Sequence, residues 1–165
     1  MALHFSKEEF QKRKIDILKS MKEQKLDALL MFRQESMYWL TGYDTFGYVF
    51  FQTLVLDKNG NITLLTRAPD LRQAQNTSNI QDIRIWIDKD GSNPTDELKI
   101  ILNEFNLKGK IIGIEYEAYG MTGRNALKLN KSLENYCVFQ DQSELITKLR
   151  VVKSKEEIVY VKRAA

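Results

Sequence analysis

Few residues of this chain could carry catalytic chemistry, and those few are far apart. The only histidine is His4, near the N-terminus, and the only cysteine is Cys137, in a stretch where a buried and unreactive thiol is expected. A metal centre needs several His, Cys, Asp or Glu side chains at metal-binding spacing, and the sequence contains no such set. We therefore expect no catalytic residue, no metal and no cofactor within this segment.

Two weaker patterns have simpler structural explanations. Asp88, Asp90 and Glu97 resemble a calcium loop only faintly, because a third acidic residue is missing and the glycine comes too early. A turn before a helix is expected there instead. Residues 120–123, Gly-Met-Thr-Gly, precede a predicted helix whose N-terminus could bind an anion, but a tight entry turn is the favoured interpretation.

Aromatic side chains are densest between residues 38 and 51. If residues 48–56 form a strand, Tyr48 and Phe50 point to one face and Phe51 to the other. Both faces cannot easily be buried inside one small domain. These rings therefore either belong to the core or, in part, cover a ligand, another domain or another subunit.

The composition is that of an ordinary globular domain. At 165 residues the chain can form one domain with a substantial core, and 43% hydrophobic and 28% charged residues are typical values. The net charge of +3 does not indicate nucleic-acid binding, because the lysines between residues 7 and 25 alternate with acidic residues, as on a solvated helix face. The lone cysteine and the absence of a signal peptide or a long apolar run predict a cytoplasmic protein without a membrane segment.

The order of predicted elements indicates the fold class. The first elements are a helix from a Ser6/Glu9 capping box to about Gln24, a strand over 28–32 covered on both sides, a helical turn over 34–40, and strands over 48–56 and 61–66. The Asn59-Gly60 pair between the last two strands predicts a tight hairpin turn. The later elements are helices beginning near 69, 94, 122 and 141, and strands over 83–87, 110–115 and 136–139. This order predicts an α/β fold, with a mixed central β-sheet that contains a β-hairpin and is flanked by helices on both faces.

The last predicted helix begins at a second capping box, Ser154 to Glu157. It has completed only about two turns at Ala165, and a helix that short is marginal alone. We therefore expect these 165 residues to be the front part of a longer polypeptide.

Two stretches, in this order and separation, resemble one known family. SMYWLTGY at residues 36–43, the hairpin after it and Leu65-Thr66-Arg67 resemble the N-terminal domain of the creatinase/prolidase family. DQSELITKLRVVKSKEEI at residues 141–158 resembles the junction that follows that domain. The resemblance covers essentially the whole chain. It implies an N-terminal domain over residues 1–150, and over residues 151–165 the junction and truncated first helix of a C-terminal catalytic domain.

The resemblance implies a ribonuclease H-like fold for this domain and a two-domain, usually homodimeric hydrolase for the complete protein. The catalytic domain of such enzymes has the pita-bread fold. In most branches it holds two divalent metal ions, such as Mn, Co or Zn, through two Asp, one His and two Glu. Those ligands would lie beyond this chain. The implied reaction is cleavage of a C–N bond in an Xaa-Pro dipeptide or another small amide.

The resemblance also implies a role for particular residues. In such enzymes the N-terminal domain supports dimerisation and covers the active site of the partner subunit. By position, Tyr43, Tyr48 and Phe50 would line the substrate in trans, with Arg67 as a further candidate. The creatine-cleaving branch carries a basic residue in this region, whereas residues 34–57 contain no Lys or Arg. This argues against creatine and leaves prolyl dipeptides or another small amide, such as an ectoine-like compound.

Two function classes are open at this point. The first is the domain of a hydrolase, and the second is a stand-alone binding or interaction module that shares the fold, because a fold does not establish function. A reading frame that continues past Ala165 with spaced Asp, Asp, His, Glu and Glu would support the hydrolase. A stop codon there would support the module.

Overall fold

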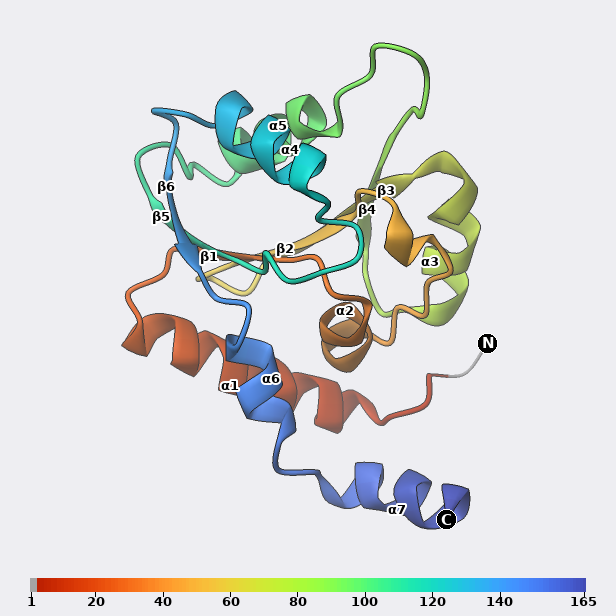
Figure 1. Cartoon of the computed structure of the whole chain (residues 1–165). Helices are drawn as coiled ribbons and strands as arrows, with labels where there is room; N and C mark the ends of the chain where they lie inside the picture. The colour runs from red at the N-terminus through yellow and green to blue at the C-terminus, as the bar shows by residue number, and fades with distance from the viewer. Residues whose placement is uncertain (1–2) are drawn as a thin grey trace.

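A mixed sheet lies at the centre of the protein, and the computed structural model describes residues 3–165 (Figure 1). Its strands are β1 (Ala28–Met31), β2 (Thr53–Asp57), β3 (Ile62–Arg67), β4 (Asp82–Trp86), β5 (Ile111–Ile114) and β6 (Val138–Asp141). Their order across the sheet is β4-β3-β2-β1-β5-β6. The β1–β2 and β2–β3 pairs are antiparallel, whereas β4, β5 and β6 join their neighbours in parallel. The predicted α/β fold with a mixed sheet and a hairpin is confirmed.

Helices cover both faces of this sheet. They are α1 (Lys7–Glu23), α2 (Gln34–Thr41), α3 (Leu71–Thr77), α4 (Pro94–Glu104), α5 (Gly123–Ser132), α6 (Leu145–Arg150) and α7 (Lys155–Ala164), with short 3-10 turns η1 (Gly47–Val49) and η2 (Ala68–Asp70). Figure 1 shows α4 and α5 on one face and α1, α2 and α6 on the other. Helix α7 lies outside this arrangement, beyond the end of α6.

The side chains of β1 alternate between two separate cores. Ala28 and Leu30 pack with residues of α4 and α5. Leu29 and Met31 pack with residues of α1, α2 and α6. All four are 0% exposed, which explains why the strand is apolar at every position. Each fully buried leucine contributes roughly 2 kcal/mol relative to an exposed one.

The predicted hairpin is confirmed, but the predicted start of its first strand is wrong. The Asp57 carboxylate accepts the backbone N–H groups of Asn59 at 2.9 Å and Asn61 at 2.8 Å, and Gly60 has a φ of +88°. Strand β2 begins at Thr53 instead of residue 48. Before it, the η1 turn bends the chain, because Phe50 donates its N–H to the carbonyl of Gly47 at 2.9 Å.

Side-chain caps begin several helices as the sequence predicts. Asn93 caps α4, Thr122 caps α5, and Ser154 with Glu157 forms a complete capping box on α7. The first predicted capping box is only half formed. Ser6 accepts from the N–H of Glu9, whereas the Glu9 carboxylate pairs with a buried arginine of its own helix. Strand β6 and helix α6 also begin later than predicted.

Within residues 3–165, no helix combines the length and the apolar character needed to cross a membrane.

The carboxyl group of Glu115 joins three elements below the surface. Glu115 follows β5 directly and is 0% exposed. Its Oε2 accepts the backbone N–H groups of Phe32 and Arg33 at 2.9 Å each, and its Oε1 accepts the hydroxyl of Ser36 at 2.5 Å. These bonds tie the end of β5 to the end of β1 and the first turn of α2. Burial raises the pKa of Glu115 to about 6, against the opposing effect of the hydrogen bonds.

This raised pKa predicts a pH dependence of stability. Below pH 4.5 the Glu115 carboxyl is protonated in both the folded and the unfolded state. Between pH 4.5 and about 6 the unfolded state loses the proton first, so the contribution of this group to stability falls as the pH rises. The loss over the whole titration is about 2 kcal/mol, because burial raises the pKa from 4.5 to about 6.

Glu115→Gln removes this titration and keeps the side-chain shape. Urea unfolding of both proteins at several pH values measures the difference in their free energies of unfolding. We expect the unmodified chain to lose about 1.5 kcal/mol relative to the variant between pH 4.5 and 6.5. A difference that is constant with pH, or that grows in favour of the unmodified chain, would contradict the prediction.

Candidate functional site

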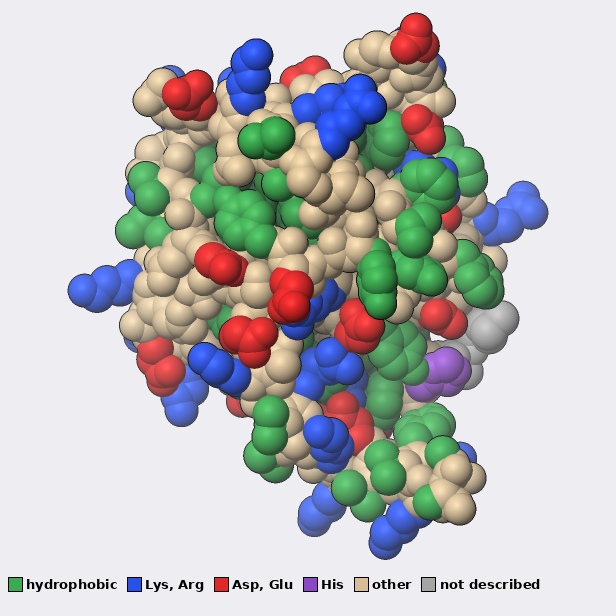
Figure 2. All heavy atoms as spheres, in the orientation of Figure 1, with side chains coloured by type: hydrophobic (Ala, Val, Ile, Leu, Met, Phe, Trp, Pro, Cys, Tyr) green, Lys and Arg blue, Asp and Glu red, His purple; other side chains and the backbone are tan. Residues whose placement is uncertain are grey.

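The segment from Phe46 to Phe50, here called the aromatic turn, exposes large apolar side chains between α2 and β2. Phe46 is 84% exposed, Val49 48% and Phe50 42%. Figure 2 shows hydrophobic side chains gathered on the side of the molecule where this turn and α3 lie. Apolar side chains that gather on a surface indicate a contact with another molecule or domain more often than isolated ones do.

Two glycines hold the backbone of the aromatic turn close to the rest of the domain. A Cβ atom at Gly47 would overlap the carboxylate of Asp70, and one at Gly120 would overlap the carbonyl oxygen of Phe50. The indole N–H of Trp86 donates to the carbonyl of Phe51 at 2.9 Å. The exposed rings are therefore presented on a fixed backbone, in spite of lying in a loop.

Arg67 lies directly against Phe50. The guanidinium carbon is 3.4 Å from the centroid of the Phe50 ring, which is a close cation–π contact. Arg67 also pairs with Asp70 at 3.1 Å and, more loosely, with Asp88 at 3.9 Å. The structure therefore brings Phe50 and Arg67 together, and it holds the guanidinium between the ring and two carboxylates.

Tyr43 lies in the interior, away from the surface formed by the aromatic turn. It is 0% exposed, its hydroxyl donates to Gln52 at 3.0 Å, and it lies 3.4 Å from the Thr66 hydroxyl. Burial raises the pKa of Tyr43. In this chain the ring supports the start of the turn and does not reach its exposed face.

Tyr48 is half-buried and faces a hollow at the carboxyl ends of two parallel strands. Its ring packs against Tyr119, with the centroids 5.5 Å apart and the planes at 68°. The hollow has a volume of about 750 Å³, and its lining includes Phe32, Arg33, Tyr116 and Arg150. Ligands of α/β sheets commonly bind at this end of the strands.

A second hollow, of about 920 Å³, lies on the other side of the aromatic turn, where Phe50 and Trp86 form part of its wall. Arg124, Lys128 and Lys131 also line it, and these three form no ion pair within residues 3–165. The aromatic turn therefore separates the hollow beside Tyr48 and Tyr119, here called the aromatic hollow, from a second one that is lined by basic side chains together with Asp88 and Asp90.

The acidic side chains and the cysteine of residues 3–165 show no arrangement for metal binding or thiol activation. No group of three or more His, Cys, Asp or Glu side chains in residues 3–165 is arranged to hold a metal ion. Burial raises the pKa of Cys137 to about 11, so its thiol stays protonated at neutral pH. The arrangement can cover or bind a small molecule or another domain.

The sequence interpretation missed three residues that the structure makes prominent. Arg13 is 1% exposed, although it lies among charges that indicated a solvated face. Its spacing from Phe10 and Ile17 places it on the apolar side of the helix, and this spacing is the sequence feature that could have predicted its burial. Glu115 and Tyr119 gave no such local signal, because their partners come from distant parts of the chain.

Two curated relatives match nearly the whole chain. An uncharacterized hydrolase/peptidase of Sinorhizobium fredii is 28% identical over 169 residues, covering 98% of this chain and 43% of the relative. The ectoine hydrolase of Halomonas elongata is 25% identical over 171 residues, covering 99% of this chain and 43% of the relative. The chain thus spans less than half the length of the curated relatives it matches.

Solved structures agree with the fold. The prolidase from Thermococcus sibiricus has a TM-score of 0.76 at 19% identity, over 94% of this chain and 41% of that one. A dipeptidase from Pyrococcus horikoshii OT3 has a TM-score of 0.71 at 26% identity, over 88% of this chain and 38% of that one. A family model described as the creatinase/prolidase N-terminal domain matches residues 13–152, and the chain belongs to that family.

Proposed function

We propose that this chain is the non-catalytic N-terminal domain of a hydrolase that cleaves a C–N bond in a dipeptide or a small amide. In this proposal the domain supports a homodimer and covers the active site of the partner subunit. The observation that carries the proposal is the aromatic turn, because it exposes apolar rings on a backbone fixed by Gly47 and Gly120. Family membership and the hydrolase names of both curated relatives support it.

Tyr48 and Phe50 are the residues that we expect to touch the substrate. Phe50 exposes its ring, and Tyr48 faces the aromatic hollow. Arg67 would act through its contact with Phe50, and Tyr43 would support the turn from within the core. A rigid surface of this kind loses little conformational entropy when it closes over a ligand.

The names of the relatives support a proposal for the substrate class. The solved relatives include a prolidase and a dipeptidase, and one curated relative is an ectoine hydrolase. We propose a prolyl dipeptide or an ectoine-like amide as the substrate. The catalytic groups and two divalent metal ions would belong to a domain that follows this one, together with the junction over residues 151–165.

The first test is metal removal from the polypeptide that carries both domains. Chelation should abolish hydrolysis of Xaa-Pro dipeptides or ectoine-like amides, and Mn, Co or Zn should restore it, because the metals would generate the attacking hydroxide. Hydrolysis that survives complete chelation would contradict the metal-dependent branch. Assaying several Xaa-Pro dipeptides and ectoine-like amides in the same experiment would identify the compound that is cleaved.

The second test replaces the exposed rings in the same polypeptide. Tyr48→Ala and Phe50→Ala should each lower kcat/KM by about ten- to a hundredfold, since each removes one aromatic contact with the substrate. Leu127→Ala is the matched control, because Leu127 is 74% exposed on α5. Values of kcat/KM equal to those of the control would exclude substrate contact by these rings.

A complementation experiment distinguishes covering in trans from covering in cis. A subunit with Phe50→Ala is mixed under subunit exchange with a subunit whose catalytic domain is inactivated. In trans, each hybrid dimer contains one active site with an intact partner domain, so roughly a quarter of the unmodified activity should return. In cis, no hybrid site is complete and the activity stays at the level of the parent variants.

A further inference from the structure

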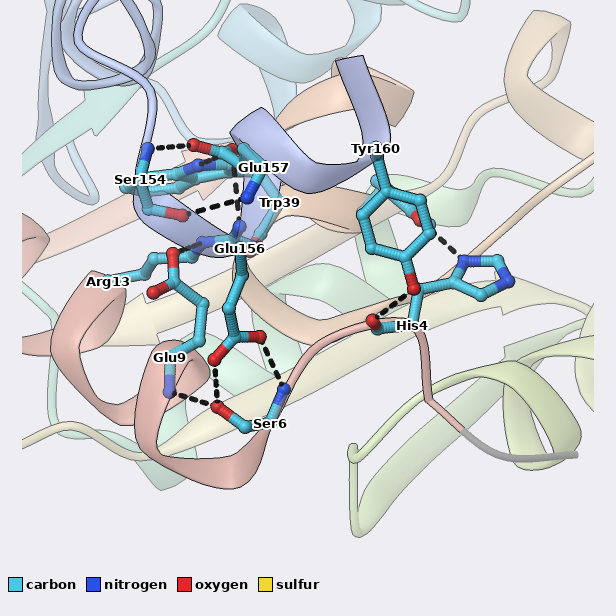
Figure 3. A network of polar contacts seen from close by, with 10 residues as sticks. His4, Ser6, Glu9, Arg13, Trp39, Ser154, Glu156, Glu157 and Tyr160 are labelled. Carbon is cyan, nitrogen blue, oxygen red and sulfur yellow. Dashed lines mark hydrogen bonds and ion pairs between the residues drawn. The ribbon is translucent and has the colours of Figure 1, made fainter. Parts of the chain in front are cut away.

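Helix α7 is attached to the domain through polar contacts of residues at the two ends of the chain (Figure 3). We call this set of contacts the clasp; its residues are His4, Ser6, Arg13, Trp39, Glu156, Glu157 and Tyr160. No residue of α7 is buried, so apolar contact, chiefly that of the Tyr160 ring with Phe5, is a limited part of its attachment. A ten-residue helix is also marginal by itself. The position and the order of α7 therefore depend on the clasp.

Arg13 is the buried centre of the clasp. Its side chain is 2% exposed and pairs with Glu9 at 2.9 Å on its own helix and with Glu157 at 3.1 Å on α7. Its Nη1 donates to the carbonyl of Trp39 at 2.8 Å, and the guanidinium carbon lies 4.1 Å from the centroid of the Phe5 ring.

The contact between Arg13 and Glu157 is the part of this centre that links α7 to the domain. Nη2 of Arg13 has no hydrogen bond within the described residues, and the Glu157 carboxylate is the charge that compensates its burial. The same carboxylate accepts the indole N–H of Trp39 at 3.1 Å. If α7 moved away, Glu9 would still pair with Nε of Arg13, but Nη2 would lose the carboxylate that faces it, which favours keeping α7 in place.

Two further contacts hold α7 to the start of the chain. The Glu156 carboxylate accepts the backbone N–H of Ser6 at 2.9 Å and its hydroxyl at 2.5 Å. Tyr160 donates its hydroxyl to the carbonyl of His4 at 2.6 Å, and its ring lies 5.4 Å from that of Phe5. Glu156 and Tyr160 are four residues apart, so both lie on the face of α7 that meets the start of the chain, as Figure 3 shows.

We propose that the clasp makes α7 a rigid extension of this domain and that Arg13 is a positioning residue for the chain beyond it. The direction in which the polypeptide leaves α7 is then set by α1 and α2 and is not left to a flexible linker. This consequence rests on the proposed function where it concerns the active site. Under that function, the clasp fixes the angle at which the aromatic turn meets the active site of the partner subunit.

Hydrogen exchange of the 165-residue chain, followed by mass spectrometry, tests the clasp without any assay of activity. In Arg13→Met the substituted residue lies on α1, so a change in the exchange of α7 must be transmitted through the contact between residue 13 and Glu157. We expect the amides of α7 to exchange about tenfold faster in this variant, while those of β1 and β5 keep their protection. Glu156→Gln should have a smaller effect of the same kind.

Controls separate the clasp from general destabilisation. Glu134→Gln is the matched control for Glu156→Gln. It also removes one carboxylate charge, but from an exposed position away from α7, and it should leave the exchange of α7 unchanged. Glu157→Gln should add little to Arg13→Met if the two side chains act as a pair. Faster exchange in β1 and β5 as well as in α7 would indicate global unfolding. That result, or an α7 that is unprotected in the unmodified chain, would overturn the proposal.

Kinetics of the two-domain polypeptide then test the consequence for the active site. Arg13→Met should raise KM by about tenfold with a smaller change in kcat, because a loosened domain covers the site less often. If exchange in α7 responds and KM does not, the clasp exists but the covering role fails. If neither responds, the clasp itself is wrong.

Discussion

The burial of β1 on both faces is the constraint on which the rest of the structure depends. All four of its residues are inaccessible to solvent, so both of its edges must also be paired, with β2 on one side and β5 on the other. Those two pairings bring the end of β5 next to the end of β1, where Glu115 accepts hydrogen bonds from the chain as it turns into α2. The start of α2 and the hollow beside Tyr48 are placed as a result.

The aromatic turn combines two properties that are seldom found in a loop. Its side chains are exposed and apolar, which is unfavourable in water, and its backbone is held by close contacts at Gly47 and Gly120. A loop that only connected α2 to β2 would need neither property. A surface prepared for contact with another molecule needs both, since preorganisation lowers the entropic cost of association. The stacking of Arg67 on Phe50 adds to the same rigidity.

Local signals in the sequence predicted the fold, and contacts between distant residues account for what it did not predict. Asn59-Gly60 and the caps at Asn93, Thr122 and Ser154 act within a few residues, so the hairpin and those helix starts were predictable. Residues 48–52 have the composition of a strand, yet the η1 turn forms there against Asp70 and Gly120, which are remote in sequence. The charges around Arg13 indicate a solvated helix face, whereas Glu157, the partner that pairs with it in the interior, lies at the other end of the chain. Of the candidate site residues, the structure brings Phe50 and Arg67 together and places Tyr43 in the interior.

The order of the strands also bears on synthesis at the ribosome. β1, β2 and β3 are consecutive in the chain and adjacent in the sheet, so this antiparallel meander can form from local contacts as soon as it emerges. The partner for the other edge of β1 is β5, which is translated only after α3, β4 and α4. During that interval a nascent chain carries an unpaired and wholly apolar strand edge, the kind of template that favours aggregation. Newly made copies of this domain therefore have a defined window in which chaperone protection matters, and it closes when Ile111–Ile114 docks.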